Sequence, residues 1–163
     1  MPEQAMPAMS FPREGGCQCG GVRYAVTCEP TALYCCHCTN CQAQGGSAFA
    51  MSMLVPRDGF AFIKGEPKRF DFVADSGNGK IGWCCPDCGV RLMHDTEGRD
   101  SITVRAGTLD GAGELRPVGH IWTRSAQAWM KFDETDLIYE KAPEDGYTAL
   151  KEKWAHQQAS LAG

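Results

Sequence analysis

The chain has 163 residues, of which 43% are hydrophobic and 22% are charged, and its formal net charge at pH 7 is -4. This length supports one domain with a hydrophobic core and is short for two. An acidic chain without a run of Lys or Arg argues against nucleic acid as a partner, and no apolar segment approaches the roughly 20 residues of a membrane helix.

The first 14 residues contain three prolines and no stretch in which basic residues are followed by apolar ones. A secretion signal requires that pattern, so none is expected here. We therefore expect residues 1–14 to form a flexible leader and the protein to be cytoplasmic.

Short segments rich in β-forming residues recur between residues 15 and 130, and Gly, Pro and Asp residues separate them. The Asn78-Gly79 pair predicts a hairpin that returns one such segment along the next, because both residues accept a positive φ. The expected strands cover residues 22–26, 48–53, 60–64, 69–72, 81–83, 102–105 and 121–122.

One helix is expected near the end of the chain. Tyr147, Leu150 and Trp154 follow the i, i+3, i+7 spacing of a helix face within residues 147–158, and Lys and Glu occupy the other positions. The sequence therefore predicts a mainly β fold of short antiparallel strands with a C-terminal helix.

Ten cysteines are an unusual number for a chain with these features. Neighbouring cysteines on one loop are poor disulfide partners but good chelators of one ion, and a reducing cytosol keeps thiols free. We therefore expect metal sites rather than disulfides. The clusters are Cys17 and Cys19; Cys35, Cys36, Cys38 and Cys41; and Cys84, Cys85 and Cys88, with Cys28 apart.

Two of the cysteine pairs have the spacing of a structural zinc site. Cys17-x-Cys19 and Cys85-x-x-Cys88 together supply the four soft ligands that zinc prefers in a tetrahedral arrangement. Such a site would close a long segment of chain and add to the folding energy. Buried free thiols and an iron–sulfur site are the alternatives.

The second group, Cys36-His37-Cys38-Thr39-Asn40-Cys41, has three cysteines at chelating spacings and no fourth at similar spacing. Catalytic zinc characteristically has three protein ligands and an open position for water or substrate. We therefore expect this site to be open, unless a fourth ligand closes it and makes it structural. The candidates for a fourth ligand are Cys35, His37, Cys28 and His94.

These three cysteine blocks, in this order, resemble the glutathione-dependent formaldehyde-activating enzyme family, which is related to centromere protein V-type domains. The resemblance covers about residues 15–143. It rests on the blocks Gly16-Cys17-Gln18-Cys19-Gly20-Gly21-Val22, Cys36-His37-Cys38-Thr39-Asn40-Cys41 and Cys85-Pro86-Asp87-Cys88-Gly89, and on Ala106-Gly107-Thr108-Leu109-Asp110, His120-Ile121-Trp122 and Trp129.

The resemblance implies a β-tent zinc-binding domain over residues 15–143, followed by a helical extension over residues 144–163. It also implies two Zn²⁺ ions per chain, one structural and one catalytic or exchangeable. The implied ligands are Cys17, Cys19, Cys85 and Cys88 for the structural ion and Cys36, Cys38 and Cys41 for the catalytic ion.

The activity implied is that of a carbon–sulfur lyase. It is the reversible addition of glutathione, or a similar small thiol, to formaldehyde, which gives S-hydroxymethylglutathione. The partners would then be a small thiol and an aldehyde. Gln42 follows the third cysteine where many members carry a basic residue, so the thiol need not be glutathione, while Cys35 and Cys84 each double a motif cysteine.

Two other functions stay open. One is that of a non-enzymatic zinc scaffold or interaction module, and the other is that of a redox or metal-handling protein. The chain could also form a homo-oligomer. His120 and Trp122 alternate on a strand-like segment and are expected to line one surface, as a pocket wall or as core residues. Arginine pairs bidentately with carboxylates. The candidates for binding the carboxylates of the thiol are Arg57, Arg105 and Arg124.

Overall fold

The computed structural model describes residues 8–163, and in this range it contains 11 β-strands, two α-helices and four short 3-10 turns. The strands are β1 Arg13–Gly16, β2 Arg23–Val26, β3 Ala32–Cys36, β4 Ala50–Pro56, β5 Phe60–Lys64, β6 Lys68–Val73, β7 Gly79–Cys84, β8 Arg91–Asp95, β9 Ser101–Arg105, β10 Gly119–Ile121 and β11 Leu137–Ile138. The helices are α1 Thr39–Gly45 and α2 Thr148–Ala162, and the 3-10 turns are η1 Arg57–Gly59, η2 Ala106–Thr108, η3 Ala112–Glu114 and η4 Thr123–Ser125.

The expected mainly β fold with a C-terminal helix is confirmed. Within the expected leader, residues 1–7 lie outside the described residues, and β1 begins at Arg13. No helix in residues 8–163 has the length and apolar character to span a bilayer.

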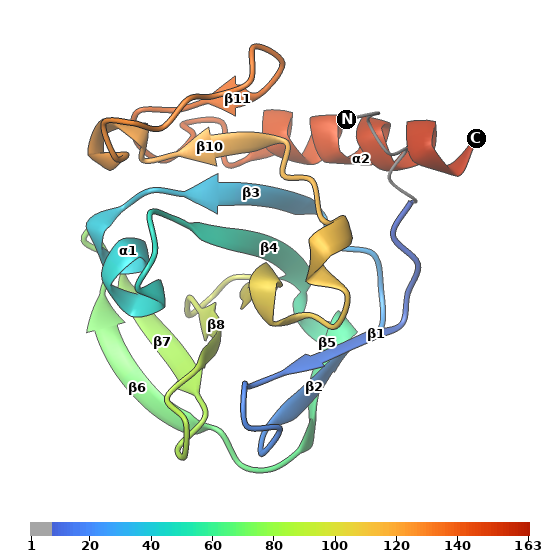
Figure 1. Ribbon diagram of the computed structural model, residues 1–163, viewed down its shortest axis with the longest axis vertical. Coiled ribbons are helices and arrows are strands. Elements are labelled where there is room, and N and C mark those ends of the chain that lie inside the picture. Colours follow the sequence, from blue (N-terminus) through green and yellow to red (C-terminus); the bar gives the residue numbers. More distant parts are fainter. Residues whose placement is uncertain (1–7) are drawn as a thin grey trace.

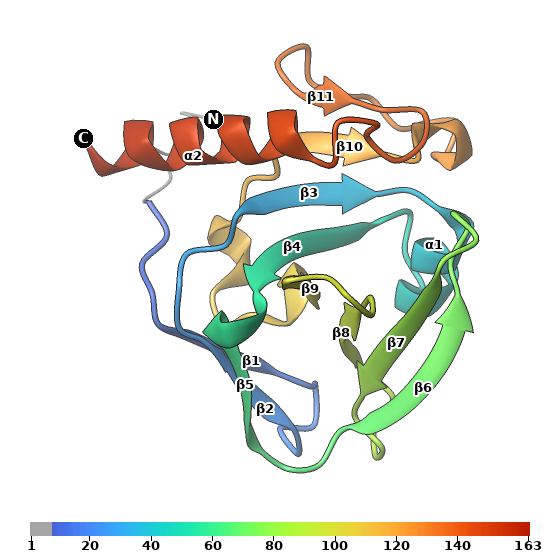
Figure 2. The ribbon, with the colours of Figure 1, turned by 180° about the vertical axis from the view of Figure 1, so that it is seen from behind.

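The strands form a three-stranded sheet in the order β1-β2-β5 and an eight-stranded sheet in the order β11-β10-β3-β4-β9-β8-β7-β6. Neighbours are antiparallel, except that β10 runs parallel to both β3 and β11. Figures 1 and 2 show the three-stranded sheet on one side of the molecule and the β6–β7 hairpin on the other, with α1 beside β6 and β7.

Each of the seven expected strands overlaps an observed one, while β1, β3, β8, β11 and α1 were not expected. The predicted hairpin joins β6 to β7, but its tight turn precedes the Asn78-Gly79 pair. Gly77 takes the positive φ of 82°, and Gly79 already pairs with Val73 at the start of β7. Ala74 N–H donates to Asn78 O at 2.9 Å and closes the loop.

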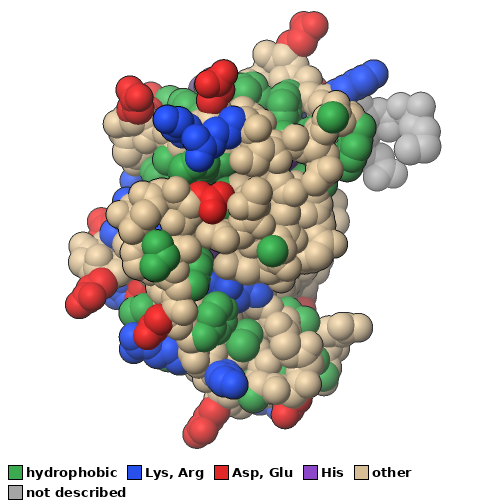
Figure 3. Space-filling view, turned by 90° about the vertical axis from the view of Figure 1, so that its left-hand side faces the viewer, with side chains coloured by type: hydrophobic (Ala, Val, Ile, Leu, Met, Phe, Trp, Pro, Cys, Tyr) green, Lys and Arg blue, Asp and Glu red, His purple; other side chains and the backbone are tan. Residues whose placement is uncertain are grey.

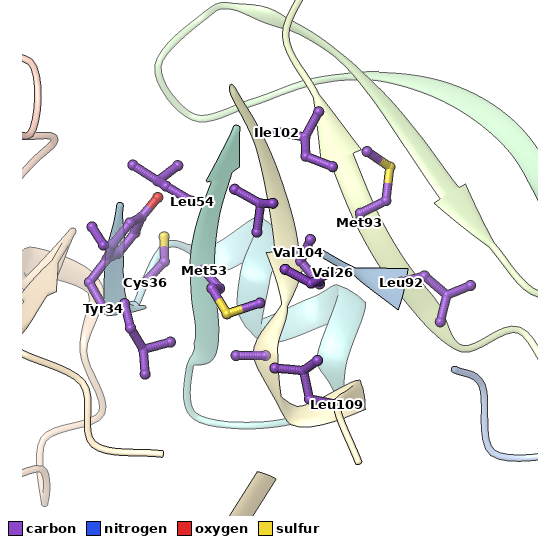
Figure 4. Close-up of a cluster of buried hydrophobic side chains, with 14 of the residues drawn as sticks. Val26, Tyr34, Cys36, Met53, Leu54, Leu92, Met93, Ile102, Val104 and Leu109 are labelled. Carbon is purple, nitrogen blue, oxygen red and sulfur yellow. The ribbon is translucent and has the colours of Figure 1, made fainter. Parts of the chain in front are cut away.

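The hydrophobic core joins residues of β3, β4, β8 and β9 in the larger sheet to residues of the smaller sheet such as Val26 (Figure 4). Helix α2 covers β3 with Leu150 and Trp154, both buried as the predicted helix face requires. Trp154 Nε1–H donates to Pro30 O at 2.9 Å, and Met9 N–H donates to Gln158 Oε1 at 3.0 Å. The helix therefore holds the start of the described chain and the strand that leads to the second cysteine group.

The face seen in Figure 3 carries Lys and Arg side chains interspersed with Asp and Glu. Opposite charges are thus mixed on this face and not separated into patches. Several ion pairs also join opposite charges elsewhere in the described chain, such as Arg57 with Asp95 and Arg116 with Asp133.

Candidate metal centres

The structure brings Cys17, Cys19, Cys85 and Cys88 together, with their Sγ atoms all within 4.8 Å of one another. The Sγ atoms of Cys17 and Cys19 lie 3.5 Å apart, and those of Cys19 and Cys85 lie 3.7 Å apart. In a tetrahedral site with zinc–sulfur bonds of about 2.3 Å, the sulfur atoms would lie roughly 3.8 Å from one another. A backbone hydrogen bond from Val90 is the main cause that lowers the pKa of Cys88 to about 6. This cluster suits a soft, tetrahedral metal ion.

Two similar turns present these sulfur atoms. Gly20 N–H donates to Cys17 O and Gly89 N–H donates to Cys85 O, both at 3.0 Å, and the two glycines have φ of 73° and 75°. Glycine adopts this left-handed conformation at no steric cost, because it has no Cβ atom. Val22 N–H also donates to Cys17 Sγ at 3.2 Å. The cluster connects the β1–β2 loop of one sheet to the β7–β8 turn of the other.

The second cluster contains Cys36, Cys38 and Cys41, whose Sγ atoms lie within 4.8 Å of one another and which are all buried. Cys36 ends β3, Cys38 is the N-cap of α1, and Cys41 N–H donates to Cys38 Sγ at 3.4 Å. The buried Arg105 donates from Nη1 to Cys41 Sγ at 3.4 Å. Hydrogen bonds from the Cys36 and Cys38 thiols and the Arg105 charge lower the pKa of Cys41.

Among the described residues, no other Cys or His lies close enough to complete the second cluster. Cys35 precedes Cys36 on β3, so its side chain points to the opposite face of the sheet. Cys28 lies against Gly59, the last residue of η1. Neither of these two thiols is therefore placed as a fourth ligand.

The two histidine candidates are also outside the cluster. His37 Nε2 is 2.9 Å from His120 Nδ1, and His120 Nε2 is 3.2 Å from Asp136 Oδ2. His94 lines the cavity beside the three cysteines, and its Nδ1 has no hydrogen-bond partner among the described residues. Burial lowers the pKa of both His37, to about 4, and His94, to about 3, so both rings are neutral at pH 7.

The three cysteines open onto a cavity of about 230 Å³. Its basic lining residues are Lys80, Arg99 and Arg105, and its acidic ones are Asp75 and Glu144. Within residues 8–163, these side chains come from β7, β9 and three loops, so the tertiary fold brings them together from distant parts of the sequence.

Two aromatic residues of this cavity have strained backbones. Trp122 and Tyr147 are the two non-glycine residues with positive φ in the described chain, at 58° and 74°, and both line the cavity. Such conformations cost of order 1–3 kcal/mol and cluster at functional sites. The expectation that His120 and Trp122 line one surface is wrong, because β10 ends at Ile121 and only Trp122 reaches the cavity.

Of the three arginines predicted to bind carboxylates, only Arg105 lines the cavity. Arg57 makes a bidentate pair with Asp95 at 2.6 and 2.7 Å, and Arg124 lies 4.9 Å from the ring of Trp122. The sequence reading missed Lys80 and Arg99, which no motif marks.

Gln42, which follows the third cysteine of the second cluster, does not line the cavity. Its Nε2 donates to His37 O at 2.8 Å and to Ser125 O at 2.7 Å, and its Oε1 accepts from Gln127 Nε2 at 2.8 Å. The amide therefore ties α1 to the loops on either side of it. A basic side chain has no acceptor group and could not reproduce the bond from Gln127.

Comparison with known proteins identifies the family of this chain. The family model described as glutathione-dependent formaldehyde-activating enzyme matches residues 12–125, which include both cysteine clusters. A crystal structure of a Rhodobacter sphaeroides protein is 21% identical to this chain, covers 64% of it and 91% of its own length, and has a TM-score of 0.49. No curated protein matches the chain. The chain belongs to the glutathione-dependent formaldehyde-activating enzyme family.

Proposed function

We propose that this chain is a carbon–sulfur lyase that catalyses the reversible addition of glutathione, or a similar small thiol, to formaldehyde. The observation that supports this most is the three-cysteine cluster at the inner wall of a cavity with basic side chains. Family membership supports formaldehyde activation in general. The structure adds the residues through which this chain would act.

We assign one zinc ion to each cysteine cluster. In the first, Cys17, Cys19, Cys85 and Cys88 supply four sulfur ligands and leave no position for substrate. In the second, Cys36, Cys38 and Cys41 supply three and leave one position free. Zinc bound there supplies the capacity to hold a thiol as its thiolate at neutral pH.

The protein side chains around the second cluster favour this role. Three thiolates and a divalent ion carry a net charge of -1, and the buried guanidinium of Arg105 offsets it beside Cys41. The neutral His94 is a weak proton acceptor because its pKa is about 3. Activation of the thiol by the metal therefore agrees better with this site than activation by histidine.

The cavity walls suit a thiol that carries carboxylates. Glutathione has two carboxylates and one ammonium group, and the cavity has Lys80 and Arg99 as cations and Asp75 and Glu144 as anions. Ion pairs with these groups would hold the thiol in place. Formaldehyde is small enough to enter beside the bound thiol without a separate pocket. Because formaldehyde reacts with thiols unaided, holding the reactants together is the main catalytic contribution.

The test is exchange between free formaldehyde and its glutathione adduct, followed by NMR with ¹³C-labelled formaldehyde. We expect the zinc-loaded protein to accelerate exchange over the buffer rate, and Cys38→Ser to return it to that rate. Glutathione diester, which lacks both carboxylates, should exchange more slowly than glutathione. Exchange at the buffer rate with the zinc-loaded protein would refute the activity with glutathione, and the same result with other small thiols would favour a zinc scaffold.

A further inference from the structure

The residue between the first two cysteines of the second cluster is anchored in three directions. His37 is fully buried, its N–H donates to Ile121 O at 3.0 Å, and its carbonyl accepts from Gln42 Nε2 at 2.8 Å. Its ring bonds to His120 at 2.9 Å. Gln18, at the equivalent place in the first cluster, is exposed, and its side chain makes no hydrogen bond in the described structure.

The ring of His37 is the inner end of a chain of hydrogen bonds that leads outward to Asp136. The carboxylate of Asp136 can only accept, so His120 Nε2 carries the proton and donates at 3.2 Å. His120 Nδ1 is then an acceptor, and His37 Nε2–H must donate to it. This assignment leaves His37 Nδ1 unprotonated, which agrees with its having no partner among residues 8–163.

Packing and charge fix the same chain from the sides. The ring of Phe132 lies 4.8 Å from His120 and 5.6 Å from His37, measured between ring centroids. Arg116 Nη2 lies 3.5 Å from Asp136 Oδ1 and orients the carboxylate. His37, which lies between the candidate ligands Cys36 and Cys38, is thus connected by packing and hydrogen bonds to side chains from residues 116–136.

We propose that Asp136, His120 and His37 are positioning residues that preorganise the three-cysteine cluster for metal binding. A site with four protein ligands is shaped by the metal itself, whereas one with three needs the scaffold to hold its open geometry. Hydrogen-bonded partners behind metal ligands commonly supply this. The proposal rests on the second zinc site, but not on the identity of the thiol. Asp136 lies outside residues 12–125, the part matched by the family.

The experiment compares zinc affinity at both clusters in one molecule. His120→Phe keeps the ring packing and removes both hydrogen bonds, and Asp136→Leu keeps the approximate size of the side chain and removes both acceptor atoms. Asp133→Asn is the control for the loss of a negative charge beside Arg116, because Asp133 Oδ2 lies 3.6 Å from Arg116 Nη2, Asp133 makes no bond to His120, and Asn keeps the Oδ1 that accepts from Thr135. Zinc per chain is measured by mass spectrometry during competition with a chelator, and the first cluster serves as the internal reference.

We expect His120→Phe and Asp136→Leu to weaken zinc binding at the second cluster by about 10–100-fold, with the first cluster and Asp133→Asn unchanged. Cobalt in place of zinc gives a second measurement, a changed thiolate-to-cobalt absorption in the two variants. Wild-type affinity in Asp136→Leu overturns the proposal, as does equal loss of metal from both clusters. If His120→Phe does not fold, Asp136→Leu alone decides. One metal ion per wild-type chain would refute the second zinc site itself, and this proposal with it.

Discussion

Removal of one ligand from each cluster is expected to have unequal effects on stability. Cys19 and Cys85 are 66 positions apart and lie in loops that follow strands of different sheets, whereas Cys36 and Cys41 are five positions apart in the sequence. The entropy of loop closure grows as (3/2)RT ln n, so the first crosslink contributes about 2 kcal/mol more than the second. For a chain of this size, that difference corresponds to about 4–8 °C in melting temperature.

The variants are Cys88→Ser, which should lose the zinc ion of the first cluster, and Cys38→Ser, which should lose that of the second. Each is purified with the zinc ion of the intact cluster in place. Circular dichroism gives the melting temperature, and mass spectrometry gives the zinc content of the same samples. We expect the melting temperature of Cys88→Ser to be at least about 4–8 °C below that of Cys38→Ser. The first cluster also has four zinc–sulfur bonds to lose and the second has three, which adds to the difference in loop-closure entropy. Cys38→Ser should keep one zinc ion and the wild-type spectrum.

Equal losses of melting temperature would contradict this reasoning. So would a Cys38→Ser variant that unfolds while Cys88→Ser stays folded with one zinc ion. Either result would mean that the second cluster stabilises the fold as strongly as the first, and the division into structural and open sites would fall.

Three further predictions concern the helix, the pH dependence and the cavity. Leu150→Ala removes a fully buried side chain and should lower the unfolding free energy by about 2–5 kcal/mol in urea titrations. His94 has its pKa lowered by burial from 6.5 to about 3, so the unfolded chain binds a proton there that the folded protein excludes. The unfolding free energy should therefore decrease as pH falls from 6.5 to 3, and less steeply in His94→Gln. Lys80→Met should raise KM for glutathione with little change in kcat, and leave the diester unaffected.

Most strands were predictable because one of their faces is less buried than the other. In β5 and β6, partly buried residues alternate with exposed ones over part of the strand and the remaining residues face solvent. The bounds of both strands were predicted to within one residue. β3 was missed because all five of its residues are buried, so no alternation marks it. It lies between β4 and β10 in the sheet, and α2 covers it. A strand buried on both faces looks the same as any short apolar segment.

The two cysteine clusters were predictable for a different reason. Ligand spacing is a local property of a loop, and the turns that present Cys17 and Cys85 are encoded by the glycines that follow them. The cavity has no such local signal. Lys80 comes from β7, Arg99 from the loop before β9, and Tyr147 from the N-cap of α2. Only the folded chain places these residues beside the same three cysteines.

The doubled cysteine at the end of β3 shows how tertiary pairing resolves a choice that spacing leaves open. β10 pairs in parallel with β3 and places His120 opposite Cys35 and Ile121 opposite Cys36. Cys36 therefore faces the cavity that Ile121 lines, and Cys35 faces the other side of the sheet. The same strand also supplies the bonds to His37, the residue that follows Cys36. A strand more than 80 positions away thus fixes which cysteine of the doublet faces the cavity and how the residue after it is held.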